Sequence, residues 1–88
     1  MQVNDVITID SEIQFGTPVF KGTRVPIISF FQHLESGVTI DAYIEDFPSV
    51  KKEQCVALLE LSEKIVTSKN FKQLYEIAAW WKLTAPVV

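Results

Sequence analysis

The sequence of 88 residues has few of the side chains from which metal, redox and nucleotide sites are built. A single cysteine, Cys55, excludes an internal disulfide and fits a reducing compartment. The only histidine, His33, has no cysteine or second histidine near it, so the chain contains no zinc motif. The three glycines form no phosphate-binding pattern. We therefore expect no metal, no cofactor, no small-molecule substrate and no enzymatic activity.

Long apolar runs are also missing. No stretch approaches the roughly 20 residues that cross a membrane, and the first residues lack the charge and the apolar segment of a signal peptide. This pattern predicts a cytoplasmic protein that does not enter a membrane.

Hydrophobic residues nevertheless make up 48% of the chain. A domain of this size buries only about 60% of its unfolded surface, so its core is small. The excess indicates either a dense core or an apolar surface intended for a partner. Disorder is excluded, because only 22% of the residues are charged and the net charge is −3.

Charge is distributed unevenly along the chain. Residues 1–48 carry seven acidic side chains against Lys21 and Arg24, whereas residues 49–88 carry six lysines against four glutamates. The basic second half favours a nucleic-acid surface, but the sequence pI of 5.0 lies far below the value above about 9 that is usual for DNA-binding domains. Ordinary surface charge explains the same distribution.

The residue patterns predict a short β-hairpin followed by helices. Residues 6–9 are β-branched throughout, and residues 19–20 form a second short strand after turn chemistry around Gly16. Apolar residues at helical spacing predict helices over residues 26–36, 40–47, 50–67 and 71–83. Capping and turn residues set the boundaries of the first three, namely Pro26, Gly37, Thr39, Pro48 and Ser49. The apolar side of the third predicted helix comprises Val50, Cys55, Val56, Leu58, Leu59, Leu61, Ile65 and Val66.

The expected fold is a single, mainly α domain over residues 1–88. A short N-terminal hairpin or strand pair precedes a bundle of three to four helices, with a core over residues 7–66 and an aromatic helix and tail over residues 68–88. The order of helix, glycine turn, short helix, proline turn and longer helix is that of helix-turn-helix domains, although helix packing alone gives the same order.

One stretch is more specific than these patterns. Residues 16–26 read Gly-Thr-Pro-Val-Phe-Lys-Gly-Thr-Arg-Val-Pro, and downstream come Leu34-x-x-Gly37, Ile40-Asp41-x-x-Ile44 and Phe47-Pro-Ser-Val50. In order and spacing, these motifs resemble the domain of unknown function 433 family over about residues 7–62. The sequence departs from the pattern at Lys51, where the family often carries Thr or Ser, and at Leu61, where tyrosine is common. The motif positions expected to be structural or to contact a partner are Gly16, Pro18, Gly22, Thr23, Arg24 and Pro48.

The resemblance implies both a fold and a function. The family looks like predicted antitoxins of type II toxin–antitoxin pairs, with a homeodomain-like helix-turn-helix core and a PIN-like ribonuclease toxin as partner. It implies nothing about the segment after about residue 66.

Arg24, the only arginine, has two interpretations. Its planar fork of five donors binds carboxylates and phosphates. An internal clamp between the hairpin and the helices is the favoured interpretation, and contact with a partner is the alternative. Within the same motif, Gly22 permits a positive φ and Thr23 can bond to backbone groups.

Lys51, Lys52 and Gln54 lie at the start of the third predicted helix, where helix-turn-helix proteins contact base edges. We expect these residues to be the DNA contacts if DNA is bound. A solvated first turn is the alternative, and Glu53 among them would repel phosphate.

Four aromatic residues mark the C-terminal segment as a candidate protein interface: Phe71, Tyr75, Trp80 and Trp81. The two adjacent tryptophans point about 100° apart on a helix, so both cannot face one narrow core stripe. An interface with a second copy or with the toxin is the favoured interpretation. The alternative is one buried tryptophan and one lying flat on the surface.

Two functions follow from these observations. The first is an antitoxin-like protein that binds and neutralises a cognate PIN-like ribonuclease and, as a homodimer, regulates its operon by binding operator DNA. The alternative is a protein-interaction or oligomerisation domain that keeps the helix-turn-helix shape but does not bind DNA.

Overall fold

A hairpin of two short antiparallel strands lies near the N-terminus of the structure, a computed structural model that describes residues 2–84 and the side chains of residues 2–77. Strand β1 (Ile7–Thr8) pairs with β2 (Val19–Phe20), with Ile7 opposite Phe20 and Thr8 opposite Val19. The hairpin was predicted, but its first strand is shorter than expected. One helical turn, α1 (Val3–Val6), precedes it, so Val6 ends a helix instead of beginning a strand.

Helices α2 (Ile27–Glu35) and α3 (Ile40–Asp46) follow, close to their predicted positions. Gly37 has φ +87° and donates its N–H to the Leu34 carbonyl, while the Val38 N–H reaches the His33 carbonyl, so α2 ends in the expected glycine cap. The Thr39 hydroxyl accepts the Ala42 N–H at 3.1 Å, which confirms the predicted cap of α3.

Helix α4 (Lys52–Val66) begins later than the sequence suggested. The predicted cap, Ser49, was wrong, because Ser49 lies in the turn after α3 and the N-cap is Lys51. Helix α5 (Lys69–Thr84) follows after only two residues, and the Ser68 hydroxyl accepts the Phe71 N–H at its start.

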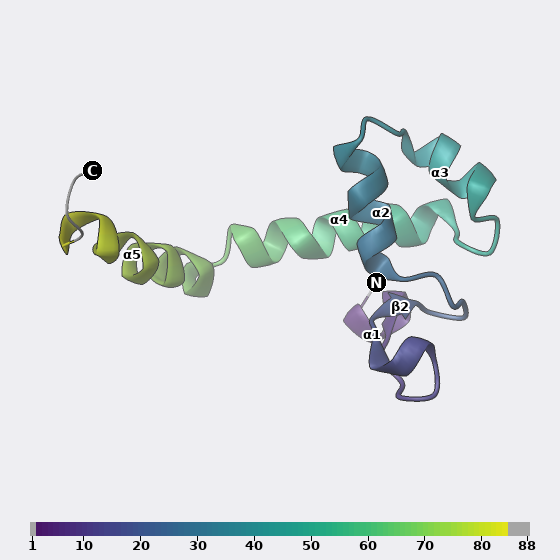
Figure 1. Cartoon of the computed structure of the whole chain (residues 1–88), viewed down its shortest axis with the longest axis horizontal. Helices are drawn as coiled ribbons and strands as arrows, with labels where there is room; N and C mark the ends of the chain where they lie inside the picture. Colours follow the sequence, from purple (N-terminus) through teal and green to yellow (C-terminus); the bar gives the residue numbers. More distant parts are fainter. Residues whose placement is uncertain (1, 85–88) are drawn as a thin grey trace.

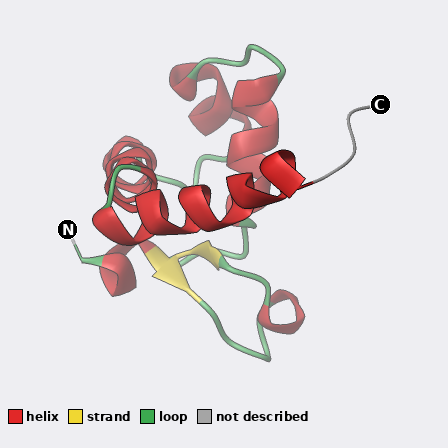
Figure 2. Ribbon diagram, turned by 90° about the vertical axis from the view of Figure 1, so that its left-hand side faces the viewer, coloured by secondary structure: helices red, strands yellow, loops and turns green. Residues whose placement is uncertain are grey.

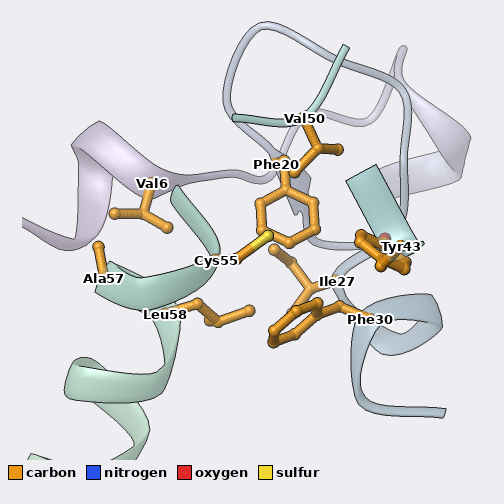
Figure 3. Packing of buried hydrophobic residues seen from close by; sticks show 9 residues of the cluster. All are labelled: Val6, Phe20, Ile27, Phe30, Tyr43, Val50, Cys55, Ala57 and Leu58. Carbon is orange, nitrogen blue, oxygen red and sulfur yellow. The ribbon is translucent and has the colours of Figure 1, made fainter. Parts of the chain in front are cut away.

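The core is built around three aromatic rings from the hairpin, α2 and α3. Phe20 lies edge-on to Phe30 at 6.0 Å, Phe30 lies edge-on to Tyr43 at 5.2 Å, and all three side chains are fully buried. The first half of α4 closes the core with Cys55 and Leu58, as Figure 3 shows. Cys55 was expected to be buried, and its burial raises the pKa of the thiol.

The chain is elongated because α4 continues beyond the core. We call residues 2–61 the head and residues 62–84 the arm; the arm comprises the end of α4 and all of α5. Figure 1 shows the arm extending away from the head, and Figure 2 views the molecule from the arm side. The radius of gyration is 16.5 Å, against about 12 Å for a compact domain of this length.

The buried hydroxyl of Tyr43 generates a test of this packing. The hydroxyl lies 2.8 Å from Ser29 Oγ, and burial raises the pKa of the phenol. Because the phenol ionises more easily in the unfolded chain, the free energy of unfolding should be fully retained below pH 10 and should fall as the pH rises above it. Tyr43→Phe should cost about 1 kcal/mol at neutral pH and should make this alkaline loss shallower, measured by urea unfolding from pH 7 to 11.

The matched control is Tyr75→Phe, since Tyr75 is 63% exposed. This variant should retain the alkaline loss seen in the wild type. An equal alkaline loss in the wild type and in Tyr43→Phe would contradict the burial of the phenol.

Candidate interaction surfaces

The glycine–threonine–arginine motif forms the turn between the hairpin and α2. Gly22 has φ +79°, and no atom lies within 4 Å of a Cβ placed there, so conformation rather than space requires the glycine. The Thr23 hydroxyl donates to the Phe20 carbonyl at 2.8 Å and accepts the Val25 N–H at 3.0 Å. The predicted roles of Gly22 and Thr23 in the backbone are therefore confirmed.

Gly16 and Pro18, two other residues of the motif, shape the chain between the hairpin loop and the start of α2. Gly16 has φ +84° at the end of the hairpin loop, and the Pro18 carbonyl accepts the Ile27 N–H at 2.9 Å, which fixes the start of α2. Pro48 is exposed and follows the cap of α3.

Arg24 is exposed, and none of the hydrogen bonds and ion pairs among residues 2–77 involves it. The structure therefore does not show the internal clamp that the sequence favoured. It leaves the guanidinium facing solvent, where the alternative of partner contact stays a prediction.

Gln54 is buried and forms hydrogen bonds within the chain, so it is not exposed to a partner. Its side chain is only 7% exposed; Nε2 donates to the Lys21 carbonyl at 3.0 Å, and Oε1 accepts the Lys51 N–H at 3.0 Å. The amide thus fastens the start of α4 to the hairpin across 33 residues of sequence. The expectation of base contact by Gln54 is corrected, because burial and these two bonds occupy the amide.

Lys51 and Lys52 are both exposed at the start of α4. Lys51 lines a hollow with Lys21, Gly22, Ser49 and Gln54, so the hairpin turn and the start of α4 form one surface, which also includes Asp5. Lys52 Nζ lies 3.0 Å from Asp41 Oδ1 on α3, with both side chains more than half exposed. Such an exposed pair is weak, so Lys52 remains available to a competing anion.

His33, Ser29 and Tyr43 form a polar cluster inside the head. His33 Nδ1 lies 2.6 Å from the Ser29 carbonyl oxygen, which assigns the proton to Nδ1. The Ser29 hydroxyl donates to the Pro26 carbonyl at 2.8 Å and accepts from Tyr43. The imidazole therefore bonds a backbone carbonyl and not the serine hydroxyl, and the cluster holds α2 against α3.

The described residues contain no other grouping of ligand side chains. Among them, no three histidine, cysteine, aspartate or glutamate side chains lie close enough together to hold a metal ion. None of the helices in this part of the chain is both long and apolar enough to cross a bilayer.

The arm carries a run of exposed apolar side chains. Ile65 is 63% exposed and Val66 54% on α4, and α5 adds Leu74, Tyr75 and Ile77 at more than 60% each. Where the two helices meet, an apolar groove forms between them and α1, lined chiefly by Val3, Leu61, Ile65, Phe71 and Leu74. We call this the elbow groove.

This distribution corrects the expected extent of the core. The sequence patterns placed the core over residues 7–66 and the candidate interface in the aromatic segment that follows. The structure leaves four of the supposed core positions of α4 exposed, namely Val56, Leu59, Ile65 and Val66. The exposed apolar surface therefore begins within α4. Of the predicted interface residues, Phe71 is half-buried at the elbow and Tyr75 is exposed, while the side chains of Trp80 and Trp81 lie outside those described.

The two bonds of Gln54 generate a prediction for stability. Gln54→Ala removes both of these part-buried hydrogen bonds and should lower the free energy of unfolding by about 2 kcal/mol. The matched control, Gln73→Ala, removes an exposed amide from α5 and should change it by less than about 0.5 kcal/mol. Urea unfolding measures both, and equal stabilities for the two variants would contradict the fastening role.

Comparisons with known proteins identify the family to which this chain belongs. The family model described as "Protein of unknown function (DUF433)" matches residues 7–61. Uncharacterized protein y4eO of Sinorhizobium fredii (strain NBRC 101917 / NGR234) is 32% identical over 50 residues, which cover 57% of this chain and 23% of that protein. The match thus spans about a quarter of the relative's length. No solved structure matches significantly. The family match contains the turn motif and the buried half of α4 but excludes α5, and the chain belongs to the DUF433 family.

Proposed function

We propose that this protein binds a partner protein through its arm, and that the partner is a ribonuclease toxin of the PIN-like class which the protein neutralises. The observation that carries the proposal is the exposure of five large apolar side chains along the end of α4 and α5. The resemblance of the head to predicted antitoxins supplies the identity of the partner.

The size of the apolar surface supports protein binding. Five large apolar side chains of the arm are more than half exposed. Soluble monomers rarely expose contiguous apolar patches larger than a few hundred Å², and larger ones usually mark interaction sites. One of the five is Tyr75, and together with the half-buried Phe71 it supplies aromatic surface, which is enriched at the centres of protein interfaces.

The charge of the arm fits the proposed partner. Lys64 borders the elbow groove, and Lys69 and Lys72 are exposed on the first turns of α5. A nuclease that holds a metal ion with carboxylates presents an acidic surface around its site. Lysines around an apolar groove complement such a surface and favour association with it.

The arm gives the first functional prediction. The full chain is co-expressed with the product of the adjacent reading frame, and Ile65→Asp and Leu74→Asp are compared with the wild type. Each variant places a charge in the elbow groove, so each should weaken co-purification at least about tenfold. Because both side chains are more than 60% exposed, the thermal midpoint should stay within a few degrees of the wild type.

The matched control is Ile9→Asp, which makes the same change at a side chain of the head that is 69% exposed. This variant should bind the partner like the wild type. Binding that survives both arm substitutions, or that Ile9→Asp weakens equally, would contradict the proposed surface.

DNA binding by the head is a second candidate function, favoured by the exposure of Lys51 and Lys52 at the start of α4. Lys21 lines the same hollow as Lys51, so cations from two segments face one surface. The burial of Gln54 removes one base-reading side chain, which favours contact with phosphates over contact with bases. The remaining alternative is an interaction domain that does not bind DNA.

Salt dependence tests this second function. Binding to the DNA upstream of the gene should weaken as salt rises, and Lys51→Glu/Lys52→Glu should reduce the slope of log K against log salt by about 2. The matched control is Lys69→Glu/Lys72→Glu on the arm, which changes the net charge equally and should leave that slope nearly unchanged. Equal effects of the two double variants, or no binding at low salt, would leave the interaction domain as the function.

A further inference from the structure

Phe15 is the most exposed large apolar side chain of the described chain, at 99%. It lies in the short helix η1 (Gln14–Gly16) of the hairpin loop and has φ +55° and ψ +35°. Its neighbour Gln14 has φ +50°. A left-handed conformation is strained for a bulky residue and persists only where the surrounding structure enforces it.

Hydrogen bonds within the loop enforce this conformation. The Asp10 carbonyl accepts N–H groups from Ile13 at 2.9 Å and Gly16 at 3.1 Å, and the Thr17 N–H reaches the Gln14 carbonyl at 3.1 Å. The Asp10 side chain also accepts the Glu12 N–H at 2.9 Å. The loop therefore fixes the backbone of Phe15 in the conformation that exposes the phenyl ring, which lowers the backbone part of the entropic cost of docking it.

An apolar hollow lies next to this loop in sequence and in space. It is lined by Thr17, Pro18, Ile27, Ile28 and Phe31, none of which is ionisable, and its volume is about 230 Å³. An apolar cavity of about 150 Å³ is large enough to take up benzene. The hollow therefore has room for a phenyl ring, but the ring of its own chain faces solvent.

We propose that a second copy of this chain docks here, each copy placing Phe15 in the hollow of the other. The chain carries both the projecting ring and a hollow of matching chemistry, separated by a single residue, Gly16, at the loop end. In a two-fold dimer the same patch of each chain contacts its copy on the other chain. One symmetric contact therefore places both Phe15 rings in hollows and fills both hollows. An unrelated partner would need its own apolar projection for the hollow.

The area sets the strength of this dimer. A fully exposed phenylalanine contributes about 200 Å², so the two rings together contribute about 400 Å², well below the roughly 1,200 Å² at which stable specific interfaces begin. The dimer should therefore be weak and depend on concentration.

The position of the contact keeps it independent of the proposed function. Figure 1 shows the hairpin loop at the edge of the head, away from α5. Docking through Phe15 thus leaves the arm free, and loss of the dimer is distinguishable from loss of partner binding.

Analytical ultracentrifugation of the full chain tests the proposal. The wild type should show a mass that rises from monomer towards dimer with concentration. Phe15→Asn removes the ring but suits the left-handed backbone, so it should weaken the dimer at least about tenfold without lowering the thermal midpoint. Ile28→Asp, which places a charge in the wall of the hollow, should have the same effect on the dimer.

Mixing the two variants gives the decisive result. Phe15→Asn keeps the hollow and Ile28→Asp keeps the ring, so a mixture should form heterodimers and reach a higher average mass than either variant alone at the same total concentration. Ile77→Asp, at an arm side chain that is 71% exposed, is the control and should dimerise like the wild type. A monomeric wild type at all concentrations, a mixture no larger than its components, or a dimer lost only in Ile77→Asp overturns the proposal.

Discussion

The packing of the first half of α4 onto Phe20 is the contact on which the rest of the structure depends. Phe20 comes from a strand of two residues that could not persist alone. Its ring is fully buried among Phe30, Tyr43 and Cys55, so the hairpin, α2, α3 and α4 meet around one side chain. Gln54 adds a polar tie at the same place by bonding the Lys21 carbonyl. The hairpin is therefore stable only because α4 covers it.

This arrangement also explains why so much apolar surface remains outside the core. Helix α4 has 15 residues and is about 22 Å long, whereas its buried residues end at Leu58. The apolar face of the helix continues past Leu58 to Ile65, where Val3 of α1 lines the same groove but leaves Ile65 63% exposed, and α5 extends the exposed surface. A small core and a long helix thus separate the chain into a packed head and an arm available to partners.

Much of the head follows from local chemistry that can be read from the sequence. Gly37, Thr39 and the glycine–threonine turn each act within a few residues of themselves, so their roles were predicted correctly. The start of α4 was misplaced because serine is a common N-cap residue and Ser49 was the predicted cap. Gln54, three residues after Lys51, is the sequence signal for a helix that begins at Lys51, because its side chain accepts the Lys51 N–H. The burial of Gln54 and the exposure of Ile65 could not be predicted, because both depend on which turns of α4 pack against the hairpin, α2 and α3 in the folded chain. The left-handed turn that exposes Phe15 gave no sequence signal beyond the nearby Gly16.

The most direct test of the proposed arm surface is hydrogen–deuterium exchange of the full chain, alone and in complex with the co-expressed product of the adjacent reading frame. In the free protein the amides of α2 and of the buried half of α4 should be protected, and those of α5 should exchange quickly because its described side chains have few neighbours. In the complex, the amides of α5 and of the exposed end of α4 should become more protected than in the free protein. Unchanged exchange in α5, with new protection confined to the head, would contradict the claim that the arm binds the partner.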